Sequence, residues 1–554
     1  MRLTALIAVF AAAFSFIVYN TVYAAGAPAA ALTGQVTSAE EPRMEGVLVS
    51  AKSEGSTITV TVVTDAQGRY SFPASKLPPG RYALAIRAVG YELDAPGNAE
   101  VAAGKTAQAD LKLKKSSDLA AQLSNGEWLM SMPGSDEQKQ GFLGCTSCHT
   151  VERIVRSKYN AEQMVDVIKR MRTYAQGSTP LRPQVRPGVR EPSVNQLTQI
   201  KKFGEYVSTV NLSKADKWSY ALKALPRPKG KATRVIYTEY ALPRPEAMPH
   251  DAMLDEQGMV WYSDFGSQFA GRLDPKTGKA VEYAIPVTKP GAPAGGLDIR
   301  FDPDGNVWLG MMYQGSVVKL DRKSGKFQSW TAPGHLENNE ARLAMVDPKH
   351  LNQDGKVWIG GDNEYRLDPK TGEWYTVDYS RGLPKDGPPA DRLGSYGVIS
   401  DSRNNFYGTN FGGQYIIRID AKTLNVTPFP TPTPNSAPRR GHMDAQDRLW
   451  FAEYRGNMIG MFDTKTERTR EWAVPTPWSN PYDAISDKDG YAWTGGMSND
   501  RVVRLNPKTD EFIEYLLPRT TNIRRVTIDN STSPPTFWIG NNHGAALIKI
   551  ELLD

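Results

Sequence analysis

Residues 234–554 repeat one pattern seven times. Each copy holds an aromatic residue inside a short apolar run, as in MVWYSD and NVWLGM, and six copies continue into a turn such as RLDPKTG. The aromatic anchors, spaced 43 to 50 residues apart, are Trp261, Trp308, Trp358, Tyr407, Trp450, Trp493 and Trp538. This period is typical of four-stranded propeller blades, so the sequence predicts a C-terminal seven-bladed β-propeller.

The two ends of this repeat complement each other. The last copy stops at ALIKIELLD, without the strand that follows the turn elsewhere, whereas residues 232–243 (ATRVIYTEYALP) resemble that strand placed before the first copy. We therefore expect residues 232–243 to complete the last blade. Such closure leaves no open sheet edge.

Residues 30–115 contain short runs in which apolar and polar residues alternate. Tyr82, Leu84 and Ile86 would share one face of a strand, and the region is predicted to be an N-terminal β-sandwich. The stretch TDAQGRYSF…LPPGRYALAIRAVGYE resembles the carboxypeptidase regulatory-like family, a transthyretin-like sandwich, over nearly the whole region. The resemblance implies a scaffolding or binding role without catalysis.

Residues 116–222 change to a helical period. Ser135 is placed to cap one helix, and Asn160 with Gln163 has the spacing of a capping box. We expect a small all-α domain here, followed by an extended linker over 223–233 (KALPRPKGKAT). The expected fold class is multidomain and mainly β, with a sandwich, this helical domain and a propeller.

The two cysteines of the chain lie in the segment Cys145-Thr-Ser-Cys148-His149. This order is typical of one covalent haem c, because two thiols add to the haem vinyl groups and the next residue offers an imidazole to the iron. A disulfide across so short a loop would stabilise little, and a thioredoxin-like pair needs a βαβ setting. Zinc needs two more ligands, yet the next histidine is His250.

The sixth iron ligand is narrowed to two methionines. Met164 and Met171 are the only methionines between residues 150 and 247. The pattern CTSCH…RI…NAEQMVDVIKRM resembles short mono-haem cytochrome c domains, in which the methionine closing such a helix is the distal ligand; this implies Met171. Histidine–methionine ligation would suit electron transfer. Alternatively, both methionines pack in the core and the iron is five-coordinate or bound by water.

The first residues are those of an export signal. Arg2 precedes an apolar run, and small residues lead to a cleavage site, so residues 1–24 are predicted to be a signal peptide. An uncleaved anchor is the alternative, but Asn20 and Thr21 shorten the apolar run below the length of a membrane span. We expect a periplasmic or secreted protein that is not an integral membrane protein after cleavage.

Positive charge is concentrated in residues 150–234, which hold 18 Lys and Arg against 6 Asp and Glu. The segment is either a solvated face with a basic linker or a docking surface for a redox partner protein that is acidic at its docking face. Nucleic acid is not an expected partner, because no recognition motif accompanies the charge.

The segment PHDAMLDEQGMVWYSD and its repeats resemble the streptogramin lyase (virginiamycin B lyase) propellers across all seven copies. In that family a histidine eleven residues before the blade tryptophan and an acid three residues after it open a lactone ester, with magnesium. The resemblance implies that His250 and Asp264 are catalytic. Glu453 matches the acid position of another blade, but Arg439 stands where its histidine is expected, so only part of the pattern is present.

Other positions equivalent to His250 carry a different set of side chains. If they converge on the channel mouth, they would favour a planar or anionic small molecule; the alternative is that the arginines pair with acids inside the blades. These ligand-binding candidates are Arg342, Tyr396, Arg439, Tyr482 and Arg524.

Three functions follow from these patterns. The leading one is a periplasmic c-type cytochrome that transfers electrons, with a propeller that binds a substrate or redox partner. The alternatives are a streptogramin-lyase-like C–O lyase and a non-catalytic binding module, for example for carbohydrate. Whether the chain is itself an enzyme stays open.

Overall fold

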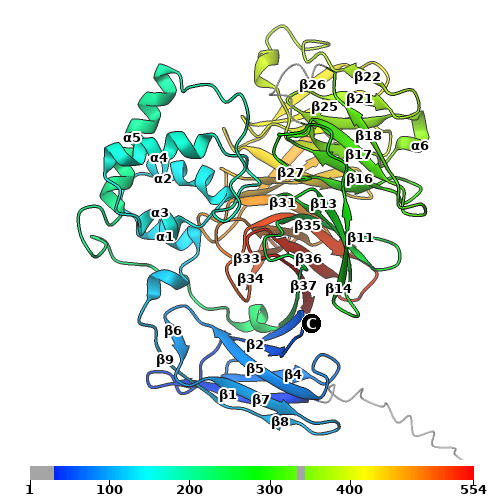
Figure 1. Ribbon diagram of the computed structural model, residues 1–554. Coiled ribbons are helices and arrows are strands. Elements are labelled where there is room, and N and C mark those ends of the chain that lie inside the picture. Colours follow the sequence, from blue (N-terminus) through cyan, green and yellow to red (C-terminus); the bar gives the residue numbers. More distant parts are fainter. Residues whose placement is uncertain (1–29, 334–342, 554) are drawn as a thin grey trace, which may run out of the picture.

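The computed structural model describes residues 30–333 and 343–553. The predicted signal peptide and Arg342 lie outside the described residues. A β-sandwich, a helical segment and a β-propeller follow each other along the chain (Figure 1). Within the described ranges, no helix combines the length and apolarity needed to cross a membrane.

The N-terminal region consists of two sheets packed face to face, with order β4-β1-β9-β6 in one and β3-β2-β5-β7 in the other. The predicted alternation is confirmed in β5, where Tyr82 and Leu84 are buried while Arg81 and Ala83 are exposed. The strands are β1 (Ala30–Ser38), β2 (Leu48–Ser53), β3 (Ile58–Val63), β4 (Arg69–Pro73), β5 (Gly80–Arg87), β6 (Tyr91–Leu93), β7 (Gly97–Val101), β8 (Ala107–Gln108) and β9 (Leu111–Lys115).

The C-terminal region is a ring of seven four-stranded antiparallel sheets. In chain order the first six blades are β11 (Pro249–Leu254), β12 (Val260–Asp264), β13 (Phe269–Asp274), β14 (Lys279–Ala284); β15 (Ile299–Phe301), β16 (Val307–Met311), β17 (Ser316–Leu320), β18 (Phe327–Thr331); β19 (Leu343–Asp347), β20 (Val357–Gly361), β21 (Tyr365–Asp368), β22 (Glu373–Thr376); β23 (Gly397–Ser400), β24 (Phe406–Thr409), β25 (Tyr415–Ile419), β26 (Val426–Pro430); β27 (Pro438–Met443), β28 (Arg448–Glu453), β29 (Met458–Asp463), β30 (Arg468–Ala473); and β31 (Pro481–Ser486), β32 (Ala492–Gly496), β33 (Arg501–Asn506), β34 (Glu511–Leu516).

The seventh blade joins the propeller to the sandwich. It contains β35 (Ile523–Asp529), β36 (Thr536–Asn541), β37 (Ala546–Leu552) and β10 (Val235–Ala241). β10 pairs along its whole length with β37, and its other edge pairs with β3 of the sandwich. One eight-stranded sheet therefore runs from the last blade into the sandwich.

The seven aromatic anchors lie in the second strand of each blade and are fully buried. A buried indole N–H needs an acceptor, and in four blades an aspartate six residues earlier supplies it. For example, Trp493 donates to Asp487 at 2.7 Å and Trp261 donates to Asp255 at 2.9 Å. Trp538, by contrast, has a buried indole N–H with no partner among the described residues.

The helical segment contains η1 (Leu119–Gln122), α1 (Asn125–Ser131), α2 (Asp136–Gln140), η2 (Gly141–Ser147), α3 (Val151–Val155), α4 (Ala161–Arg172) and α5 (Val194–Val210). The predicted caps are confirmed: Ser135 and Asn160 each close a capping box, the latter with Gln163. Short helical turns elsewhere are η3 (Gly230–Thr233), α6 (Leu351–Asp354) and η4 (Ala390–Arg392).

The expectation of a distinct all-α cytochrome c domain over 116–222 is wrong. Only α4 and α5 exceed seven residues among the described helices, and the core of the segment is not separate from the propeller. Instead Trp128 and Phe142 share one hydrophobic cluster with Tyr454, Tyr482 and Met497 of the propeller. The fold class is therefore a mainly β chain with a sandwich and a propeller, onto which a helical segment packs (Figure 1).

Residues 223–229 run extended between the three regions. The Leu225 amide donates to Glu127 of α1 at 2.7 Å, and the Arg227 side chain donates to the Glu45 carbonyl of the sandwich at 2.9 Å. Arg501 of the sixth blade donates to the Pro226 carbonyl at 2.8 Å. The predicted linker is thus bonded to all three regions.

The Trp493–Asp487 hydrogen bond gives a test of the blade pattern. Trp493→Phe should lower the free energy of unfolding by about 1–2 kcal/mol more than Trp538→Phe, because both lose the same ring volume but only the first loses a hydrogen bond. Urea unfolding followed by circular dichroism measures the difference. Equal losses would contradict the assigned role of the aspartate.

Candidate functional site

β-bulges at the channel place pairs of consecutive residues in the propeller centre. Register shifts interrupt the first strand of several blades at Pro249/Ala252, Pro438/Gly441, Pro481/Ala484 and Ile523/Val526. A bulge frees the two residues it contains from the strict alternation of faces. The residue pairs in these bulges are His250 and Asp251, Arg439 and Arg440, Tyr482 and Asp483, and Arg524 and Arg525.

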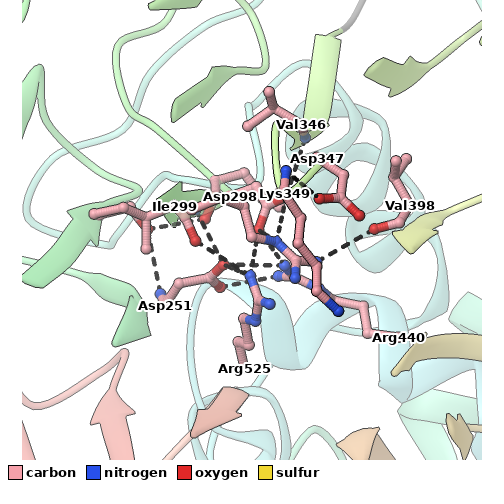
Figure 2. A network of polar contacts seen from close by, with 12 residues as sticks. Asp251, Asp298, Ile299, Val346, Asp347, Lys349, Val398, Arg440 and Arg525 are labelled. Atoms are coloured by element: carbon pink, nitrogen blue, oxygen red, sulfur yellow. Dashed lines mark hydrogen bonds and ion pairs between the residues drawn. The ribbon is translucent and has the colours of Figure 1, made fainter. Parts of the chain in front are cut away.

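The second residue of each pair, together with Asp298 just before β15, belongs to a buried ionic network, here called the channel network: Asp251, Asp298, Arg440, Asp483 and Arg525. Arg440 binds Asp251 at 2.9 and 3.0 Å and Asp298 at 2.6 Å. Arg525 also binds Asp298 at 2.6 Å (Figure 2). Burial favours a neutral Asp251, but Arg440 and His250 outweigh it and hold the pKa of this carboxyl well below its usual range. The network ties distant blades together across the channel.

The first residues of the pairs and Tyr396, just before β23, form a second group. It is called the cap-facing layer here because it faces the helical segment, and it consists of His250, Tyr396, Arg439, Tyr482 and Arg524. Its contact with the helical segment is direct, since Tyr396 and Tyr482 pack in the cluster that contains Trp128. Arg342, the remaining ligand-binding candidate, lies outside the described residues.

A hydrogen-bonded chain links this layer to the network. His250 Nδ1 donates to Asp251 at 2.6 Å, its Nε2 lies 3.1 Å from the Tyr482 hydroxyl, and that hydroxyl lies 2.5 Å from the hydroxyl of Tyr396. Burial lowers the pKa of His250 to about 4 against the effect of Asp251, so the imidazole is neutral. Burial would raise the pKa of Tyr396, but Arg439 outweighs it and the pKa is lowered.

The two predicted acids lie away from His250. Asp264 forms an ion pair with Arg244 and accepts from the Gly266 amide at 2.9 Å; no hydrogen bond joins it to His250. Glu453 is buried without a hydrogen-bond partner among the described residues. Burial and the charge of Glu471 raise its pKa to about 9, so it is a neutral acid near pH 7.

Arg439 and Arg524 both lie over the ring of Tyr482, at 3.9 and 5.4 Å from the ring centroid. Arg439 also contacts the rings of Tyr454 and Phe411, at 4.5 and 4.6 Å. Neither arginine pairs with a carboxylate in the part of the chain that the structure describes. Arg440 and Arg525 do pair with acids, as the alternative expected, but with acids of other blades.

The Cys145–His149 segment lies against the same layer. The Asn522 side chain donates to the Thr146 carbonyl at 3.1 Å, and Arg524 and His543 donate to the Ser147 carbonyl at 3.2 and 3.1 Å. Both cysteines are free and partly buried. Sequence reasoning did not single out Asn522 and took His543 as a structural or solvent-facing residue, whereas the paired residues at equivalent repeat positions could have indicated the channel network.

The two predicted methionines differ in environment. Met164 of α4 is 3% exposed and packs in the cluster shared with the propeller. Met171, at the end of the same helix, is 38% exposed. Within the described residues, no group of three or more His, Cys, Asp and Glu side chains is arranged to hold a metal ion.

Comparisons with known proteins identify the N-terminal region and give the propeller structural neighbours. The carboxypeptidase regulatory-like domain family matches residues 31–114. No curated protein matches the chain.

Virginiamycin B lyase from Staphylococcus aureus is 21% identical, with 57% of this chain and 99% of that chain covered and a TM-score of 0.48. A streptogramin B lyase structure is 21% identical, covering 58% and 100%, with a TM-score of 0.49. The extracellular domain of a hybrid two-component system from B. thetaiotaomicron is 15% identical, covering 55% and 40%, with a TM-score of 0.42.

The raised pKa of Glu453 should make the free energy of unfolding depend on pH. Its pKa rises from 4.5 to about 9 on folding, so the folded chain holds an extra proton between these values. The stability from this group is complete below pH 4.5 and is lost as pH rises toward 9. Between pH 5 and 9 the thermal midpoint of the natural chain should fall more than that of Glu453→Gln. Parallel pH curves would contradict a buried neutral acid.

Proposed function

We propose that the chain is an exported electron-transfer protein with one haem c attached at Cys145, Cys148 and His149, and with a propeller that acts as a binding module. The observation that carries the proposal is the C-x-x-C-H segment, whose two thiols are free and whose histidine directly follows them. The proposal concerns an attachment segment on the propeller and does not need a separate cytochrome fold.

The residues of the segment suit the group. His149 Nδ1 donates to the Thr150 carbonyl at 3.0 Å, so the neutral ring keeps its Nε2 lone pair for a metal. Burial lowers the pKa of His149, which favours this neutral form. Cys145 and Cys148 are partly buried and not bonded to each other, so both thiols are available for thioether links.

The propeller holds the segment in place. Asn522, Arg524 and His543 bind the backbone carbonyls between the two cysteines rather than the side chains. The backbone is thereby fixed while Cys145, Cys148 and His149 keep their reactive atoms free. When bound, a haem c would carry single electrons by cycling its iron between two oxidation states.

An acidic redox partner suits the outer surface of the helical segment. Arg153, Arg170, Lys201 and Lys202 are all exposed there. The excess of positive charge in residues 150–234 would attract such a partner, and this attraction would weaken as the salt concentration rises.

The lyase alternative has little support in the arrangement around His250. This imidazole is buried, and its Nε2 is occupied by the Tyr482 hydroxyl. Its acid partner is Asp251, which is itself bound to Arg440, and Asp264 is bound to Arg244. A general base must reach a substrate proton, and these contacts leave no free atom of His250 to do so.

Expression with cytochrome maturation genes tests haem attachment. The natural chain should be red and should keep its haem through denaturing electrophoresis, with the mass of polypeptide plus one haem. Cys145→Ser/Cys148→Ser should be colourless in the gel yet folded, because neither thiol bonds to another residue's side chain in the described structure. A natural chain with the bare polypeptide mass would contradict the proposal.

We propose that Met171, which is 38% exposed, is the sixth ligand of the iron. Met171→Ala should remove the weak far-red absorption band of methionine–iron bonding from the oxidised protein and lower its reduction potential. Met164→Ala should keep the band but lower stability by about 2–5 kcal/mol, because it opens a cavity in the shared core. A band that survives Met171→Ala would exclude this ligand.

A further inference from the structure

Arg439 and Arg524 carry buried charge that the fold does not neutralise. Their exposed fractions are 7% and 2%, and the Nε of each is buried without a hydrogen-bond partner in the described structure. Arg524 donates to the Ser147 carbonyl, and Arg439 contacts the Met497 sulfur, at 3.8 Å, and the Tyr396 side chain, neither of which is a carboxylate. Removing a guanidinium from water costs several kcal/mol unless an anion compensates it.

The adjacent residues show how the same fold treats a structural arginine. Arg440 and Arg525 follow Arg439 and Arg524 directly in the same bulges, and both are equally buried. Each binds two carboxylates of the channel network. The cap-facing layer, in contrast, contains no Asp or Glu at its described positions, so its two cations lack the anion that their neighbours have.

The surroundings of this cation pair indicate the kind of anion. The Arg439 guanidinium is enclosed by the rings of Phe411, Tyr454 and Tyr482. Such an aromatic, buried site disfavours a strongly hydrated phosphate, while a carboxylate has lower charge and matches the planar fork of an arginine.

We infer that Arg439 and Arg524 form a carboxylate-binding site in the centre of the propeller, beneath the Cys145–His149 segment. The contact of Arg524 with the Ser147 carbonyl places the site next to the proposed haem attachment. Two sources supply this chemistry: a haem propionate, or a free organic acid in the channel. Only the first source rests on the proposed function.

The site is tested first in the haem-free chain, Cys145→Ser/Cys148→Ser. Succinate titrated by calorimetry should bind, and Arg439→Gln or Arg524→Gln should each weaken binding roughly 10- to 100-fold, the loss of a charge-assisted hydrogen bond. Arg455→Gln is the matched control, because Arg455 is exposed and donates to the Phe411 carbonyl at 2.9 Å beside the site. It should leave binding unchanged.

Stability without ligand gives an independent readout. Arg439→Met should raise the thermal midpoint of the haem-free chain, because it removes an uncompensated buried charge; a purely structural arginine would lower it. Succinate binding that the Arg439 and Arg524 variants do not weaken, or no binding at all, overturns the inference.

The haem-loaded chain then distinguishes the two sources. If a propionate occupies the site, the loaded chain should no longer bind succinate; if the ligand is a free acid, it should bind succinate as the haem-free chain does. Haem attachment is scored separately by colour and mass. A colourless natural chain that still binds succinate through Arg439 and Arg524 would reject the haem and keep the carboxylate site.

Discussion

The strand β10 uses both of its hydrogen-bonding edges, and the arrangement of the three regions depends on it. One edge pairs with β37 and closes the propeller ring, and the other pairs with β3 of the sandwich. An isolated edge strand would leave unpaired N–H and C=O groups open to other chains. Here each edge is covered, so the sandwich is bound to the propeller by backbone hydrogen bonds as well as by side chains.

In the centre of the propeller, adjacent residues have two different roles. In the bulges of β27 and β35 one arginine binds the carboxylates that join the blades, and the residue before it faces the helical segment without a carboxylate. A buried charge without its partner is strongly destabilising. The contrast between Arg440 and Arg439 therefore distinguishes a cation that supports the fold from one that is available to a ligand.

Much of the fold could be predicted from local patterns. Trp493 and its counterparts mark the blades because each must be buried, and Asn160 marks a helix start because its side chain caps the first turn. The packing of the helical segment could not be predicted, because it depends on contacts such as that of the Gly126 amide with the Ser498 carbonyl, across more than 350 residues of chain. For the same reason the contacts of Asn522 and His543 with the cysteine segment escaped sequence reasoning, although Cys145, Cys148 and His149 themselves were evident.

The positions of the residues equivalent to His250 could be predicted, but their hydrogen-bond partners could not. Repeat alignment placed Tyr396, Tyr482 and His250 at equivalent sites, and the structure joins them in one hydrogen-bonded chain. It also gives His250 a different acid, Asp251, from the one that the family resemblance implied. Spacing along a strand does not report which side a bulge turns a side chain toward.

The pairing of β10 has a consequence for how the chain matures. Synthesis delivers β3 and β10 long before β37, so one edge of the growing sheet stays open until almost all of the propeller has emerged. An unfinished chain would present that edge to its neighbours, and chaperones would have to shield it. The last strand to arrive thus ends the period in which the protein is vulnerable to aggregation.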